Sequence, residues 1–153
     1  MQDSRECVNL VLVAVERRAM LRSFKRDLAS LAPLFEFTGD FAIAHQLDES
    51  VLFAMNLSIE ELFTNMVKYG GGDDIVFVAL DILGDDLVIE LVHAGAREFD
   101  PNTAKAADPK QSLAEREPGG LGLQLVRSVM DLVSYQHTDG DARIKLVKHL
   151  RGA

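Results

Sequence analysis

A single long helical pattern constrains the fold of this chain more than any other feature of its sequence. Between Ser50 and Tyr69, apolar residues recur every three or four positions, which is the period of an amphipathic α-helix. The apolar residues of this pattern are Leu52, Met55, Ile59, Leu62, Phe63 and Met66. The run Gly70 to Gly72 follows at once and predicts the end of the helix. We therefore expect a long helix that is buried over most of its surface.

The other periodic segments predict a layer of strands and further helices around this helix. Val8 to Val15 is short and rich in valine and leucine, which favours a buried strand. Leu121 to Leu132 has a helical pattern. Two hairpins are expected, Ile75–Leu83 with Leu87–Val92 around Gly84-Asp85-Asp86, and Val133–Gln136 with Ile144–Leu150 around Asp139-Gly140-Asp141. Two helix–hairpin units in succession favour an α/β (α+β) two-layer sandwich, with helices on one face of a mixed, mostly antiparallel sheet.

Another helix is predicted over Met20 to Ala32, because its apolar residues are also spaced three or four apart. Pro33 follows where a helix should already have ended. The opposite face of this predicted helix carries the basic residues Arg18, Arg22, Lys25 and Arg26. A basic stripe of this kind is usually a solvated face, and a docking surface for an acidic partner is the less frequent alternative.

The composition is that of one globular domain and disfavours several classes of protein. The 153 residues are enough for a single domain, expected over residues 1–153. The formal net charge of -8 disfavours direct contact with nucleic acid or an anionic membrane. Cys7 is the only cysteine, which fits the reducing cytoplasm. The histidines are widely scattered, so a protein-held zinc site is not expected.

Three polar residues share one face of the long helix. Glu61, Asn65 and Tyr69 are spaced one turn apart. The amide oxygen of Asn65 could ligate Mg²⁺, and the carboxylate of Glu61 could accept a proton from an attacking hydroxyl or water. For this helix alone, a partly exposed glutamate beside an ordinary asparagine is the more frequent explanation.

A glycine cluster precedes the last helical pattern, with the sequence Gly119-Gly120-Leu121-Gly122-Leu123. Glycines let a backbone approach phosphate oxygens closely, and the amides at a helix N-terminus attract anions. The cluster is not a P-loop, because no Lys-Ser/Thr follows it. It is not a dinucleotide fingerprint either, because Leu125 occupies the position of the third glycine. A flexible hinge is the alternative.

The order and spacing of these segments resemble the GHKL ATPase/kinase superfamily, and most closely its small bacterial anti-sigma-factor serine/threonine kinases. The segment Glu61-x₃-Asn65-x₂-Lys68-Tyr69-Gly70 is similar to the N box of that family. The cluster Gly119 to Leu123 is similar to its glycine box, and Phe99-Asp100-Pro101 is similar to the tail of the box between them. The resemblance covers nearly the whole chain.

The resemblance implies ATP and Mg²⁺ as ligands and a role for each motif. Glu61 would be the general base and Asn65 the magnesium ligand. Lys68 and Tyr69 would neighbour the phosphates or the ribose. The nucleotide would also contact Gly95, Phe99, and the amides of Gly119, Gly120, Leu121, Gly122 and Leu123, under a mobile lid at about 96–118.

The resemblance also implies partner proteins. Members of this family bind a sigma factor and phosphorylate a serine or threonine of a small anti-anti-sigma protein, which then releases them. Homodimers are usual among them. A sensor histidine kinase is disfavoured, because the short segment before the long helix begins with a predicted strand and leaves no room for a dimerising helix pair.

One position departs from the family pattern. Family members have Asp-x-Gly at the end of the hairpin strand, where the carboxylate accepts a hydrogen bond from the adenine amino group. This chain has His93-Ala94-Gly95. A neutral imidazole can accept one hydrogen bond, but a bond to a charged group is worth roughly twice the ~1 kcal/mol of a neutral one. Two functions stay open: an active kinase, and a non-catalytic partner-switching module with weakened or lost ATP binding.

Overall fold

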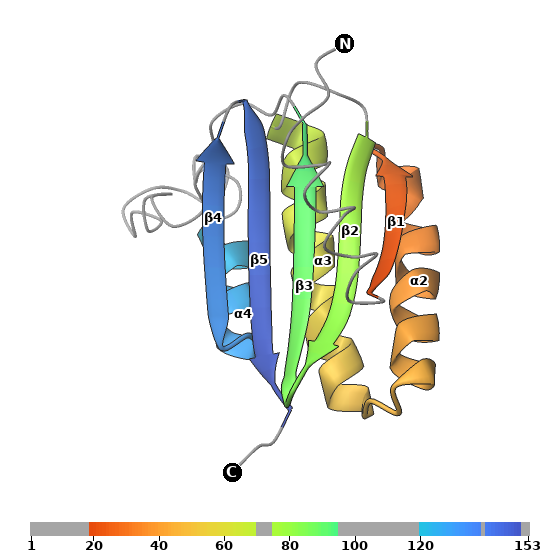
Figure 1. The fold of residues 1–153 in the computed structure, drawn as a ribbon. Helices are drawn as coiled ribbons and strands as arrows, with labels where there is room; N and C mark the ends of the chain where they lie inside the picture. Colours follow the sequence, from red (N-terminus) through yellow and green to blue (C-terminus); the bar gives the residue numbers. More distant parts are fainter. Residues whose placement is uncertain (1–18, 70–74, 95–119, 139, 151–153) are drawn as a thin grey trace.

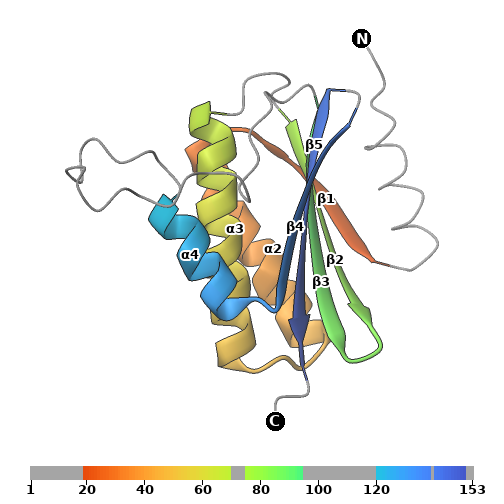
Figure 2. The same cartoon turned by 90° about the vertical axis from the view of Figure 1, so that its left-hand side faces the viewer.

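An antiparallel sheet with helices on one face forms the fold (Figures 1 and 2). The computed structural model describes residues 19–69, 75–94, 120–138 and 140–150. The five strands are hydrogen-bonded in the order β1-β2-β3-β5-β4, and each described pair is antiparallel. The elements are β1 (Met20–Lys25), the 3₁₀ turn η1 (Leu28–Ser30), α2 (Leu31–Ala44), α3 (Glu49–Tyr69), β2 (Ile75–Leu83), β3 (Asp86–His93), α4 (Gly120–Val129), β4 (Leu132–Thr138) and β5 (Asp141–His149). The predicted two-layer α/β sandwich is confirmed.

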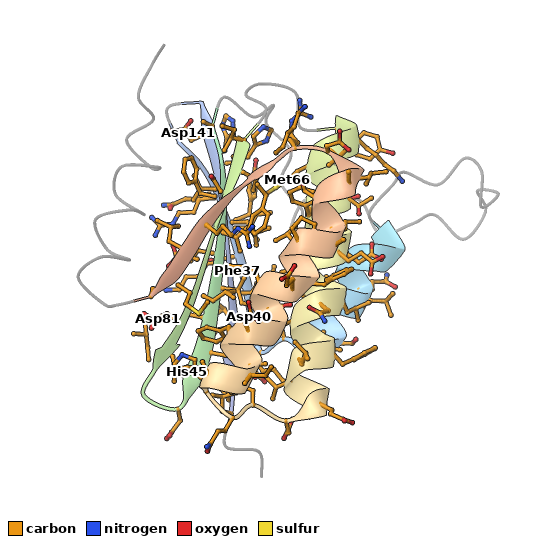
Figure 3. All side chains as sticks on the ribbon, turned by 90° about the vertical axis from the view of Figure 1, so that its right-hand side faces the viewer. Phe37, Asp40, His45, Met66, Asp81 and Asp141 are labelled. Atoms are coloured by element: carbon orange, nitrogen blue, oxygen red, sulfur yellow. The ribbon has the colours of Figure 1, made fainter. Side chains whose placement is uncertain are left out.

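The core lies between the sheet and the helices. Successive side chains of a strand point to opposite faces, so residues two apart share one face. Val76 and Val78 of β2 are fully buried and belong to the same apolar cluster as Met55 of α3. Figure 3 shows Phe37 of α2 and Met66 of α3 in this layer. Within the described residues, no helix is both long and apolar enough to cross a membrane.

Both predicted hairpins are present. Leu83 pairs with Asp86 across the first turn, so Gly84-Asp85 alone connects β2 to β3. Gly84 has φ 62, a left-handed conformation that glycine adopts without steric cost. The strands of the second hairpin, β4 and β5, pair in the same antiparallel manner. The predicted long helix is also present, as α3.

The helix predicted over Met20 to Ala32 is wrong. Residues Met20–Lys25 form the edge strand β1, which pairs with β2 along its whole length. Phe24 is 5% exposed and reaches the core from this strand, so its burial does not require a helix. The helix α2 begins only at Leu31, and Pro33 lies in its first turn. A proline there removes no helical hydrogen bond, because the first amides of a helix have no intrahelical acceptor.

The basic residues assigned to that helix therefore have a different setting. Arg22 and Lys25 are exposed on β1 rather than on a helical stripe. The guanidinium carbon of Arg22 lies 5.2 Å from the centroid of the Phe24 ring, within the range of a cation–π contact. Arg18 and the predicted strand Val8–Val15 lie outside the described residues.

Asp48 caps the N-terminus of α3. Its Oδ1 accepts hydrogen bonds from the Ser50 hydroxyl at 2.6 Å and from the Val51 amide at 3.0 Å. The second bond satisfies one of the amides that the first turn of a helix leaves without a partner. The Ser50 hydroxyl and then the Val51 amide lower the pKa of the Asp48 carboxyl, because both stabilise its charged form.

Replacing Asp48 with alanine should lower the unfolding temperature at neutral pH, because the cap is lost. Because the pKa of Asp48 is lower in the folded than in the unfolded state, Asp48 stabilises the fold at pH values above its unfolded pKa near 3.8. This contribution is lost as the pH falls through the folded-state pKa. The difference in unfolding temperature between wild type and Asp48→Ala, followed by circular dichroism, should therefore shrink in acid. Asp40→Ala, which removes an exposed acid within α2, is the control. A difference that stayed constant down to strong acid would contradict the pKa argument.

Candidate functional site

One strip of α3 carries three of the predicted site residues. Glu61, Asn65 and Tyr69 follow one another at intervals of one helical turn. Glu61 and Asn65 are half-buried, whereas Lys68 and Tyr69 are exposed in the last turn. The strip therefore leads from a half-buried carboxylate to an exposed phenol at the C-terminal end of the helix.

The helix α4, which carries part of the glycine cluster, packs against this strip. A Cβ atom added to Gly122 would overlap the Glu61 side chain, 2.9 Å from its carboxyl carbon and closer still to Oε2. Cβ atoms in proteins do not approach other atoms so closely, so a glycine is required at this position for the carboxylate to stay where it is. Two motifs that are far apart in the sequence are thus in direct contact.

Buried apolar side chains hold α4 in this place. Leu123 is 6% exposed, and Val126 is fully buried in the same cluster as the core residues of α3. The two helices run side by side in Figures 1 and 2. Gly120 and Leu121 form the first turn of α4, whose amides have no intrahelical acceptor and which carries the positive end of the helix dipole. Such a terminus suits a phosphate group.

His93 is the last residue of β3. It pairs with Val76 of β2 and with Ala142 of β5, and it is fully buried. It lies two residues beyond Leu91, a core residue, so its side chain is on the helix-covered face of the sheet. The end of β3 and the C-terminal end of α3 lie at the same end of the molecule (Figures 1 and 2).

Part of the predicted site lies outside the described residues: Gly95, Phe99, Gly119 and the lid at about 96–118. In the part of the chain that the structure describes, no group of three or more His, Cys, Asp or Glu side chains could hold a metal ion. Mg²⁺ in nucleotide sites is held by one or two protein ligands together with phosphates and water. A magnesium ion held by Asn65 would therefore need phosphate and water oxygens as its other ligands.

Two features of this region were not predicted from the sequence. The glycine spacing predicts phosphate approach, whereas Gly122 also makes room for Glu61. The basic pattern places Arg26 in a solvated stripe, whereas the Arg26 guanidinium reaches the last turn of α3. Both contacts join segments that are distant in the sequence, so local spacing carried no signal for either.

The described site combines a helix that bears Glu61 and Asn65 with a second helix that begins at Gly120, both on one face of an antiparallel sheet. The sequence of this chain matches one known family. Over residues 24–148, the sequence matches the family described as histidine kinase-like ATPase domain. The chain belongs to this family. The resemblance to the GHKL superfamily inferred from the sequence motifs is thereby confirmed.

Relatives of this histidine kinase-like ATPase domain include a named kinase. Serine/threonine-protein kinase BtrW of Bordetella bronchiseptica is 29% identical over 100 residues, which are 63% of this chain and 70% of BtrW.

Two solved structures share the fold. The RsbU and RsbW domains of a Mycobacterium tuberculosis protein match with a TM-score of 0.64 and 15% identity, over 88% of this chain and 33% of that chain. The chain thus spans about a third of the length of that two-domain chain. The SiaB–SiaC complex from Pseudomonas aeruginosa matches with a TM-score of 0.62 and 17% identity, over 94% of this chain and 99% of that chain.

The contact between Gly122 and Glu61 can be tested by a double-mutant cycle. Gly122→Ala should be less favourable in the wild-type domain than in a Glu61→Ala background, because the added methyl group must displace the end of the Glu61 side chain. The same substitution should be neutral or stabilising in a Glu61→Ala background, because alanine favours a helix more than glycine does. We expect a coupling of about 1 kcal/mol in urea unfolding. Equal effects of Gly122→Ala in the two backgrounds would show that the side chains do not meet.

Proposed function

We propose that this chain is an anti-sigma factor with ATP-dependent serine/threonine protein kinase activity, which phosphorylates an anti-anti-sigma protein. The observation that carries the proposal is the contact between Glu61 of α3 and Gly122 in the first turn of α4. It sets a carboxylate beside a helix N-terminus suited to phosphate. Family membership supports a kinase-like ATPase domain, and the name of the relative BtrW supports a protein kinase.

Each residue of the proposed site has a role in phosphoryl transfer. ATP, when bound with Mg²⁺, supplies the phosphoryl group, and the metal ion neutralises its charge. The Glu61 carboxylate accepts the proton of the serine or threonine hydroxyl as that oxygen attacks. Asn65 would offer its amide oxygen to Mg²⁺, and Lys68 and Tyr69 would border the phosphates or the ribose. The amides of the first turn of α4, with that of the preceding Gly119, would hold the phosphates.

The partner proteins are part of the same proposal. A sigma factor would be bound, and a small antagonist protein would be the phosphorylation substrate that releases it. The SiaB–SiaC complex, which shares this fold, joins two proteins, and this supports an interaction of the present chain with a second protein. A homodimer in the cytoplasm completes the proposed arrangement.

A second function is favoured by one observation. His93 stands where the family has an aspartate that accepts a hydrogen bond from the adenine amino group, and His93 is fully buried. A buried neutral imidazole offers at most one acceptor for that bond. The alternative is therefore a partner-switching module of the same fold that is not catalytic and in which ATP binding is weakened or lost.

Glu61→Gln should reduce phosphate transfer from labelled ATP to a cognate anti-anti-sigma protein by roughly 100-fold or more, because a glutamine cannot accept the hydroxyl proton. Glu60→Gln is the matched control, since Glu60 is the exposed neighbour of Glu61 on the same helix. It should leave the rate of transfer nearly unchanged. Absence of transfer by wild type, or equal rates for wild type and Glu61→Gln, would refute the kinase proposal.

Mg-ATP should raise the unfolding temperature of the wild-type domain, because a ligand that binds only the folded state stabilises it by mass action. His93→Asp should tighten Mg-ATP binding by about tenfold, since a charged acceptor strengthens the bond to the adenine amino group. Calorimetric titration of both proteins measures this change. A ligand of micromolar Kd gives a clear thermal shift at about millimolar concentration. If millimolar Mg-ATP does not raise the unfolding temperature of wild type but raises that of His93→Asp, the non-catalytic alternative is favoured.

A further inference from the structure

The short segment between β1 and α2 is held in one shape by its own hydrogen bonds. The Asp27 carboxylate accepts a hydrogen bond from the Ala29 amide at 2.9 Å, and the Ser30 hydroxyl donates one to the Lys25 carbonyl at 2.6 Å. The Ser30 amide donates to the Asp27 carbonyl at 2.9 Å. Ser30 is buried, so this bonded turn is part of the packed structure. The backbone of Arg26 therefore leaves the strand in a fixed direction.

That direction brings Arg26 to the C-terminal end of α3. Its Nη1 atom donates to the Met66 carbonyl at 3.1 Å and to the Val67 carbonyl at 3.2 Å. Both carbonyls belong to the last four of α3, which have no amide partner within the helix. A positive charge at this end also interacts favourably with the negative end of the helix dipole. Arg26 thus satisfies the end of a helix that lies 40 residues further along the chain.

The last turn of α3 carries part of the proposed nucleotide site. Asn65, Lys68 and Tyr69 lie in or beside it, and three glycines, Gly70 to Gly72, follow in the sequence. Both bonds to this turn come from Nη1 of Arg26, which carries two N–H groups and so can donate to two neighbouring carbonyls at once.

We propose that Arg26 is a positioning residue for the nucleotide site: its bonds to Met66 and Val67 hold the last turn of α3 so that Asn65, Lys68 and Tyr69 meet the nucleotide. The expected effect of Arg26 on ATP binding rests on the proposed function. Its effect on the position of the last turn of α3 does not. Exchange of the amides in this turn and binding of Mg-ATP can therefore be measured separately.

The experiment compares Arg26→Gln and Arg26→Lys with two controls. Lys25→Gln removes an adjacent exposed positive charge, and Ile82→Ala lowers stability near the β2–β3 turn, at the opposite end of the molecule (Figure 1). Hydrogen–deuterium exchange of amides 65–69 reports the last turn of α3, with amides 52–60 as the internal reference. Calorimetric titration with Mg-ATP gives the Kd of each variant.

Arg26→Gln should accelerate exchange of amides 65–69 by about tenfold relative to amides 52–60 and weaken Mg-ATP binding by about tenfold, the loss expected for a charge-assisted hydrogen bond. Arg26→Lys should recover part of both, and neither control should change either. Unchanged local exchange in Arg26→Gln, or an equal increase in Ile82→Ala, would overturn the inference. If wild type does not bind Mg-ATP, the proposed function fails, while the exchange data still decide whether Arg26 holds the turn.

Discussion

The close approach of α4 to α3 is the constraint on which the candidate site depends. Gly122 has no side chain, and the Glu61 carboxylate occupies the space that one would fill. Leu123 and Val126 of α4 are buried and hold this helix against the core. The close approach of α4 to α3 therefore results from apolar burial and does not depend on an attraction between Gly122 and Glu61. A carboxylate and a set of helix-terminal amides are thereby held together before any ligand arrives.

The helix α3 is held at both ends by side chains from outside it. Asp48 satisfies an amide at its N-terminus, and Arg26 satisfies two carbonyls at its C-terminus. The charges are those that the helix dipole favours, negative at the start and positive at the end. Between these ends, residues such as Met55 are fully buried against the sheet. The helix is therefore held in place at both ends and along its buried face, and with it the strip that carries Glu61 and Asn65.

The sequence allowed much of this fold to be predicted, because α3 and both hairpins have a strong apolar period and glycine-bearing turns. It failed over Met20 to Ala32, where residues such as Phe24 fit a helical spacing although the chain forms a strand, a turn and the start of α2. Pairing of β1 with β2 is a long-range interaction, and it overrides local spacing. The contact of Gly122 with Glu61 is long-range in the same sense. Motif order could identify both residues, but only the packing of α4 shows how close they are.

The direct pairing of β3 with β5 has a consequence for how this architecture can diversify. The two strands are neighbours in the sheet, although the chain makes a long excursion between them. The entropy cost of closing a flexible loop grows slowly with its length, by about 0.6 kcal/mol for each doubling. Insertions can therefore diversify this architecture at little cost only outside α4 and β4, because Val126 of α4 is buried in the core and β4 pairs with β5 along its length.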